Sequence, residues 1–132
     1  MILIDTHVLI WLRAGDARLG PICRTELDRA LQESELALSA ISFWEIELLR
    51  NSGRIELRLE TAEWRRRLMD EGLIELPVDG ETGIRAASLS GFGGDPADRL
   101  IVATALAGHR LVTADRRILQ WPGTLAKLDA TQ

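Results

Sequence analysis

Short apolar runs alternate along this chain with segments in which apolar residues recur every three or four positions. The short runs lie at residues 1–5, 36–40, 74–79 and 110–114. The periodic segments cover residues 6–15, 21–35, 42–50, 63–71 and 80–90, and another starts at residue 96. Runs of this length are typical of buried strands, and the periodic segments are typical of amphipathic helices.

Strands that alternate with helices predict right-handed βαβ units, so we expect an α/β fold with a parallel sheet and helices on both faces. The sheet should have four to five strands, the fifth near residues 125–129. Asp95 and Pro96 fit the cap and first position of a helix. Residues 53–59 are either extended or a short helix. The whole chain, residues 1–132, is expected to form a single domain.

Composition excludes several classes of protein. Cys23 is the only cysteine and the N-terminus lacks a basic signal region, so we expect no disulfide, no membrane span and a cytoplasmic location. The net charge of -4 disfavours a protein covered in positive potential. Lys127 is the only lysine, and the arginines are expected mainly on solvated helix faces.

Four acidic residues lie within or beside strongly apolar segments: Asp5, Glu45, Asp98 and Asp115. Desolvating an ionised carboxylate costs several kcal/mol unless a positive group compensates. Ligands of open α/β sheets bind beyond the carboxyl ends of the strands, which is where Asp5, Asp115 and Glu45 are expected. The topology therefore brings three of the four acids to one edge.

Each acid also has a simpler explanation. Asp5 and Asp115 could cap the helical turns that follow them, and Asp115 could pair with Arg116 or Arg117. Asp98 could complete a capping-box arrangement with Asp95. Glu45 is the hardest to explain in this way, because its neighbours along the helix are largely apolar.

A cluster of these acids would favour a cation. Carboxylates held about 4 to 6 Å apart repel by roughly 1 to 4 kcal/mol per pair, and a divalent cation removes that penalty. Oxygen ligands without histidine or cysteine favour Mg²⁺ or Mn²⁺ over zinc. His7 and His109 are expected to take part in ordinary packing or capping, and Cys23 and the four tryptophans in the core or an interface.

The order of the motifs resembles that of a known family. The chain has a strand followed by Asp5-Thr6, a helix start with Ser39, Ser42 and Glu45, the sequence DRLI at 98–101 and LVTAD at 111–115. This set resembles the PIN domain, and specifically the VapC toxins of bacterial type II toxin-antitoxin pairs. The resemblance covers nearly the whole chain.

The resemblance implies a function. Asp5, Glu45, Asp98 and Asp115 match an acidic quartet that binds Mg²⁺ or Mn²⁺ and cleaves RNA, and we expect Asp5 to be a bridging ligand. Thr6, Ser42 and Thr113 match supporting hydroxyls, and Asp95 an outer-shell or capping position. The family also implies a homodimer and a cognate antitoxin that blocks the site, and residues 50–64 are our candidate for part of that partner groove.

Since an acidic pocket repels RNA, we expect flanking arginines, Arg99 and Arg116, to contact the substrate. Three alternatives to the ribonuclease stay open. A magnesium-dependent phosphatase or phosphoacceptor would need a lysine near the site, whereas the sole lysine is Lys127. A structure-specific DNA nuclease would use the same acids, and a catalytically silent domain would only bind protein.

Overall fold

The computed structural model describes all of residues 1–132 and contains five strands and seven helices. In chain order the elements are β1 (Ile2–Ile4), α1 (Thr6–Ala14), α2 (Pro21–Gln32), β2 (Leu36–Ser39), α3 (Ile41–Asn51), α4 (Thr61–Asp70), β3 (Ile74–Leu76), α5 (Gly80–Ala87), α6 (Pro96–Ala105), β4 (Arg110–Thr113), α7 (Arg116–Leu119) and β5 (Lys127–Asp129). None of the helices combines the length and the apolar character that a membrane crossing requires.

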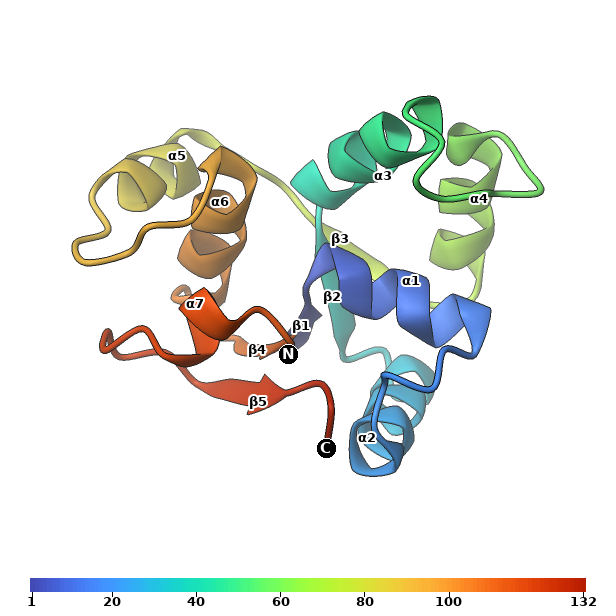
Figure 1. Cartoon of the computed structure of the whole chain (residues 1–132), viewed down its shortest axis with the longest axis horizontal. Helices are drawn as coiled ribbons and strands as arrows, with labels where there is room; N and C mark the ends of the chain where they lie inside the picture. The colour runs from blue at the N-terminus through green and yellow to red at the C-terminus, as the bar shows by residue number, and fades with distance from the viewer.

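The strands form one parallel sheet in the order β3-β2-β1-β4-β5. Strand β1 lies at the centre, between β2 and β4. Helices lie on both sides of this sheet (Figure 1), with α5, α6 and α7 on one side and α1 and α2 on the other. The α/β class, the parallel sheet and the fifth strand predicted from the sequence are confirmed.

The core has two halves because successive side chains of a strand point to opposite faces of the sheet. Ile2 and Ile4 of β1 pack with residues of α1, α2, α3 and α4. Leu3, between them, packs with residues of α6 and α7 on the other face. Strand β1 is therefore buried on both faces, which accounts for its uninterrupted apolar sequence.

Aspartates start four of the helices, and one of them, Asp79, caps α5 through the Thr82 backbone N–H. The side chains of Asp5, Asp95 and Asp115 accept backbone N–H groups at the first turns of α1, α6 and α7 respectively. Pro96 occupies the first turn of α6, where its missing N–H costs no helical hydrogen bond. The cap predicted for Asp95 is confirmed, and the capping considered as an alternative for Asp5 and Asp115 is present as well.

The structure departs from the sequence prediction in one connection and at several element ends, since α2 and α5 end at Gln32 and Ala87, before the predicted residues 35 and 90. Residues 53–60 form neither strand nor helix, although Ile55 and Leu57 still pack against the core. Strand β3 ends at Leu76, before the predicted residue 79, because Pro77 has no N–H to continue the ladder.

Candidate active site

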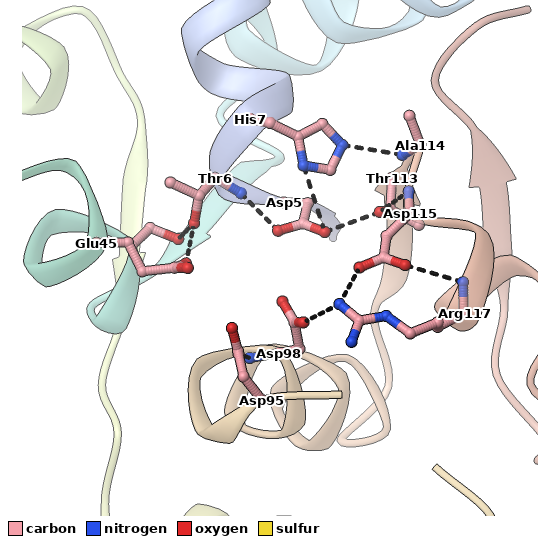
Figure 2. Close-up of polar contacts among 11 residues, drawn as sticks. Asp5, Thr6, His7, Glu45, Asp95, Asp98, Thr113, Ala114, Asp115 and Arg117 are labelled. Carbon is pink, nitrogen blue, oxygen red and sulfur yellow. Dashed lines mark hydrogen bonds and ion pairs between the residues drawn. The ribbon is translucent and has the colours of Figure 1, made fainter. Parts of the chain in front are cut away.

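The carboxyl ends of β1 and β4 place two acids side by side. Asp5 follows β1 directly, and Asp115 lies just beyond β4, the neighbouring parallel strand. Glu45 reaches the same edge from α3, which follows β2 on the other side of β1. Asp98 comes from the first turn of α6, and Figure 2 shows the four carboxylates around one region. The structure thus brings all four predicted acids to one site.

Asp5 is held rigidly at the centre of this site and is only 3% exposed. Its Oδ1 accepts the Thr6 backbone N–H at 2.8 Å, and its Oδ2 accepts the Thr113 hydroxyl at 2.8 Å. The Thr113 hydroxyl in turn accepts the backbone N–H of Asp115 at 3.0 Å. One threonine therefore fixes the relative positions of two of the acids.

Glu45 is positioned by two hydroxyl groups. The Thr6 hydroxyl donates to Glu45 Oε1 at 2.5 Å and lies 2.7 Å from the hydroxyl of Ser42 (Figure 2). A hydroxyl has one proton, so Ser42 can donate to Thr6 while Thr6 donates to the carboxylate. Both hydroxyl residues are buried. Thr6 and Thr113 thus donate to two of the acids and Ser42 contacts Thr6, while a supporting role for them in catalysis stays a prediction.

The carboxylate of Asp98 faces the other acids and does not complete a capping box. The backbone N–H of Asp98 donates to Asp95 Oδ1 at 2.9 Å, which is the cap of α6. The Asp98 side chain instead contacts Arg117, whose Nη2 lies 3.1 Å from Asp98 Oδ2 and 3.3 Å from Asp115 Oδ2. Capping of α6 therefore does not explain why residue 98 is an acid.

Crowding of negative charge changes how readily two of the acids ionise. Burial, followed by the charges of Asp95, Asp5, Asp115 and Glu45, raises the pKa of Asp98 to about 7. Arg117 acts in the opposite direction, but four carboxylates outweigh one guanidinium. The pKa of Glu45 is also raised, mainly by burial and further by Asp5 and Asp95, against a lowering hydrogen bond from Thr6. The site is therefore short of positive charge.

The donor set suits a hard divalent cation, although the present side-chain orientations do not assemble its ligands. All four acids offer oxygen atoms, and their mutual repulsion favours a cation. As oriented here, however, no three acidic, histidine or cysteine groups converge closely enough to share one metal ion. Asp98 and Asp115 are instead joined through Arg117. A shared metal ion would require these side chains to turn toward one another and Arg117 to release Asp98 and Asp115.

Arg99 contacts the backbone of its own chain. Its guanidinium donates to the backbone carbonyls of Ala86, Ala87, Leu89 and Phe92 at 2.8 to 3.4 Å. These contacts tie the end of α5 and the connection that follows it to the start of α6, which argues against the predicted RNA contact. Arg116 is exposed and takes part in no ion pair, and its contact with RNA stays a prediction.

Two residues beside the acids were not recognised from the sequence. Arg117 was considered only as a partner of Asp115, whereas it also contacts Asp98. His7 accepts the Ala114 backbone N–H through Nε2 at 3.0 Å, and its Nδ1 lies 3.8 Å from Asp5 Oδ2. Its position two residues after Asp5, in the first turn of α1, was the only available signal.

The sole lysine lies outside the acidic site. Lys127 Nζ donates to the carbonyls of Ile118 and Trp121 at 3.3 and 2.9 Å. A phosphatase or phosphoacceptor of the receiver type needs such a cation beside the transferred phosphoryl group. The position of Lys127 therefore argues against both alternatives.

Comparison with known families agrees with this arrangement of strands and acids. The family model described as PIN domain matches residues 2–122, a span that includes all four acids. The chain belongs to the PIN domain family.

Among curated proteins, this chain is similar to "Ribonuclease VapC22" from Mycobacterium tuberculosis (strain ATCC 25618 / H37Rv), with 39% identity over 119 residues, 89% of this chain and 88% of the relative. Among solved structures, the fold of this chain is similar to that of "Toxin-antitoxin complex from Klebsiella pneumoniae", with a TM-score of 0.65, 20% identity and coverage of 98% of both chains. "Crystal structure of DNA bound VapBC from Salmonella typhimurium" has a TM-score of 0.69 and 18% identity, covering 97% of this chain and 96% of that one. These structures support the fold.

Proposed function

We propose that this protein is a metal-dependent endoribonuclease of the VapC type and acts as the toxin of a toxin-antitoxin pair. The observation that carries the proposal is the convergence of Asp5, Glu45, Asp98 and Asp115 from separate segments of the chain (Figure 2). The name of the mycobacterial relative supports RNA as the substrate. The hydroxyls around Asp5 and Glu45 support a site built to hold carboxylates in fixed positions.

The metal, Mg²⁺ or Mn²⁺, would be held by the four acids Asp5, Glu45, Asp98 and Asp115. Asp5 is the proposed bridging ligand. When bound, such a metal lowers the pKa of a water molecule and neutralises charge on the phosphate oxygens. The protein's own part is to fix these carboxylates: Thr113 holds Asp5, and Thr6 holds Glu45. Asp95 is not one of the proposed metal ligands. It caps α6 and thereby positions Asp98.

Cations at the rim of the site would offset the repulsion between RNA and the acids. Arg116 and Arg117 start α7 beside Asp115, and both are exposed. Arginine contacts to phosphates fix the position of the chain without reading its sequence. Substrate choice by this protein is thus proposed to rest on groups outside the acidic quartet.

The proposed activity is tested by incubating purified protein with RNA in Mg²⁺ or Mn²⁺ and, in parallel, in excess chelator. Cleavage is expected only with metal, because the site has too few cationic side chains to offset the charges of its carboxylates and of the RNA phosphate. A single-stranded DNA of matched sequence distinguishes the ribonuclease from a DNA nuclease. Cleavage of RNA at the same rate in chelator would contradict the metal-dependent site.

A groove remote from the acids is our proposed binding site for the antitoxin. It has a volume of about 940 Å³ and lies between α1, α4 and the segment 55–59, which overlaps the predicted partner region. Its floor is apolar, including Ile10, Leu57 and Trp64, and Arg58 is exposed at its edge. An amphipathic antitoxin segment with apolar side chains and an acidic residue facing Arg58 fits this surface.

Replacing Trp64 with Ala is expected to weaken binding of the cognate antitoxin by about thirtyfold, or about 2 kcal/mol, since large aromatic anchors dominate such interfaces. Isothermal titration calorimetry measures the change. Ile22→Ala is the matched control, because Ile22 is 68% exposed and lies outside the groove. Arg58→Glu, which cannot disturb the core, should weaken binding as well. Unchanged affinity in both groove variants would place the antitoxin elsewhere.

The protein is further proposed to form a homodimer and to act in the cytoplasm, where its RNA substrate is found. The exposed side chains of Trp44 and Leu48, four residues apart on α3, support an interface on that helix. Sedimentation equilibrium tests the dimer: wild-type protein should have twice the chain mass, and Leu48→Glu should be monomeric. A monomeric wild-type protein would exclude it.

A further inference from the structure

Arg117 is the only arginine or lysine in contact with any of the four acids. Its Nη2 lies 3.1 Å from Asp98 Oδ2 and 3.3 Å from Asp115 Oδ2, so one nitrogen bridges two carboxylates (Figure 2). The Arg117 side chain is 56% exposed, whereas that of Asp98 is 12% exposed. A flexible cation thus covers a nearly buried acid from the solvent side.

The two carboxylate oxygens that Arg117 contacts, Asp98 Oδ2 and Asp115 Oδ2, accept no hydrogen bond from the backbone. Asp115 uses Oδ1 to accept the Arg117 backbone N–H at 2.8 Å, which leaves Oδ2 for the guanidinium. A metal ion that Asp98 and Asp115 held through these Oδ2 atoms would have to displace Arg117. A guanidinium keeps its charge at all ordinary pH values, so its repulsion of a second cation does not titrate away.

The rest of Arg117 can stay in place when its guanidinium moves. The backbone of Arg117 is fixed by the cap of α7, and this hydrogen bond does not involve the charged group. Rotation of the side chain alone therefore releases Asp98 and Asp115 without unfolding α7. The released guanidinium stays beside the site, where its paired N–H groups match the oxygens of a phosphate.

We infer that Arg117 competes with the divalent metal for Asp98 and Asp115, and that metal binding transfers its guanidinium to a phosphate of the bound RNA. This inference rests on the proposed function, because it requires both a metal and a phosphodiester substrate. Arg117 then has two successive partners in the same site. It offsets part of the negative charge of Asp98 and Asp115 before the metal binds and positions the substrate afterwards.

The test compares Arg117→Gln with wild-type protein, with Arg116→Gln as the matched control for the binding of metal without RNA. Arg116 is the adjacent arginine, is exposed and has no ion pair with the acids. Calorimetric titration with Mn²⁺, without RNA, should show about tenfold tighter binding by Arg117→Gln and less than about twofold change in Arg116→Gln. In chelator, Arg117→Gln should also melt at a lower temperature, since the acids lose their counter-ion.

Steady-state cleavage at saturating Mn²⁺ tests the second half of the inference. Arg117→Gln should raise the KM for RNA by about fivefold, and Arg117→Lys should recover part of this loss because it keeps a charge without the paired donors. Metal binding that is unchanged or weaker in Arg117→Gln overturns the competition, and an unchanged KM overturns the contact with phosphate. If wild-type protein neither binds Mn²⁺ nor cleaves RNA, the proposed function itself fails.

Discussion

Replacing Asp98 with Asn is expected to lower RNA cleavage by more than about a hundredfold while the protein remains folded. Loss of a group that merely orients a metal ligand typically costs about 10- to 100-fold, and loss of a ligand should cost more. Asp98 faces Arg117 and Asp115 and lies at the centre of the negative charge of the site. Initial rates of cleavage with Mg²⁺ measure the effect, and circular dichroism checks the fold.

Glu45→Gln should cause a comparable loss, and Glu47→Gln is its matched control on the same helix. Glu47 lies two residues away in α3 and contacts Arg50 and Thr61, so its replacement should change the cleavage rate by less than about twofold. Full activity in both the Asp98 and the Glu45 variants would remove the acidic site from the mechanism. Equal loss in Glu47→Gln would indicate a general effect on α3.

We compare the free energy of unfolding of wild-type protein with that of Asp98→Asn, both in chelator. The value for wild-type protein is expected to fall relative to the variant as the pH rises from about 4 to about 7. The pKa of Asp98 in the folded protein is about 7, against an ordinary value of 3.8. In this range the folded state binds more protons than the unfolded state, so raising the pH favours unfolding. Below this window Asp98 is protonated in both states and contributes nothing to the difference.

The size of this effect has an upper limit. A shift from 3.8 to about 7 corresponds to at most about 4 kcal/mol, because rotation of the Asp98 side chain toward solvent relieves part of the repulsion. We therefore expect Asp98→Asn to be more stable than wild-type protein by about 1 to 3 kcal/mol at pH 8 in chelator. Urea unfolding of both proteins between pH 4.5 and pH 8 measures the difference.

Millimolar Mg²⁺ at pH 8 should stabilise wild-type protein and leave Asp98→Asn nearly unchanged, because a ligand that binds only the folded state raises its stability. A stability difference that stays constant with pH would show that Asp98 is not held among like charges. Stabilisation of both proteins by the same amount would place the metal elsewhere.

The parts of the site that were predictable follow from local sequence. Asp5 and Asp115 each follow a short apolar run, and the carboxyl ends of parallel strands meet at one edge of a sheet. Glu45 lies on a helix among apolar neighbours, which excluded a simple surface role. These three positions needed only the order of strands and helices, and the fold class followed from the same pattern.

The remaining features depend on contacts between segments far apart in the sequence. Whether Asp98 capped α6 or faced the acids was decided by the packing of α6 beside β4 and α7. From the sequence alone, Arg99 and Arg117 are both expected on the solvent-exposed surface. In the structure, Arg99 instead donates to backbone carbonyls at the end of α5 and in the connection that follows it. No local pattern distinguishes an arginine that binds carbonyls from one that binds carboxylates.

The most direct test of the central claim is the chemistry of the RNA ends produced by wild-type protein with Mg²⁺, analysed beside the Asp98→Asn variant. Water activated at a metal site and a departing 3′ oxygen give fragments with a 5′-phosphate and a 3′-hydroxyl. We predict these ends with wild-type protein, no fragments in chelator and almost none with Asp98→Asn. Fragments ending in a 2′,3′-cyclic phosphate, formed equally in chelator and by the variant, would contradict the account.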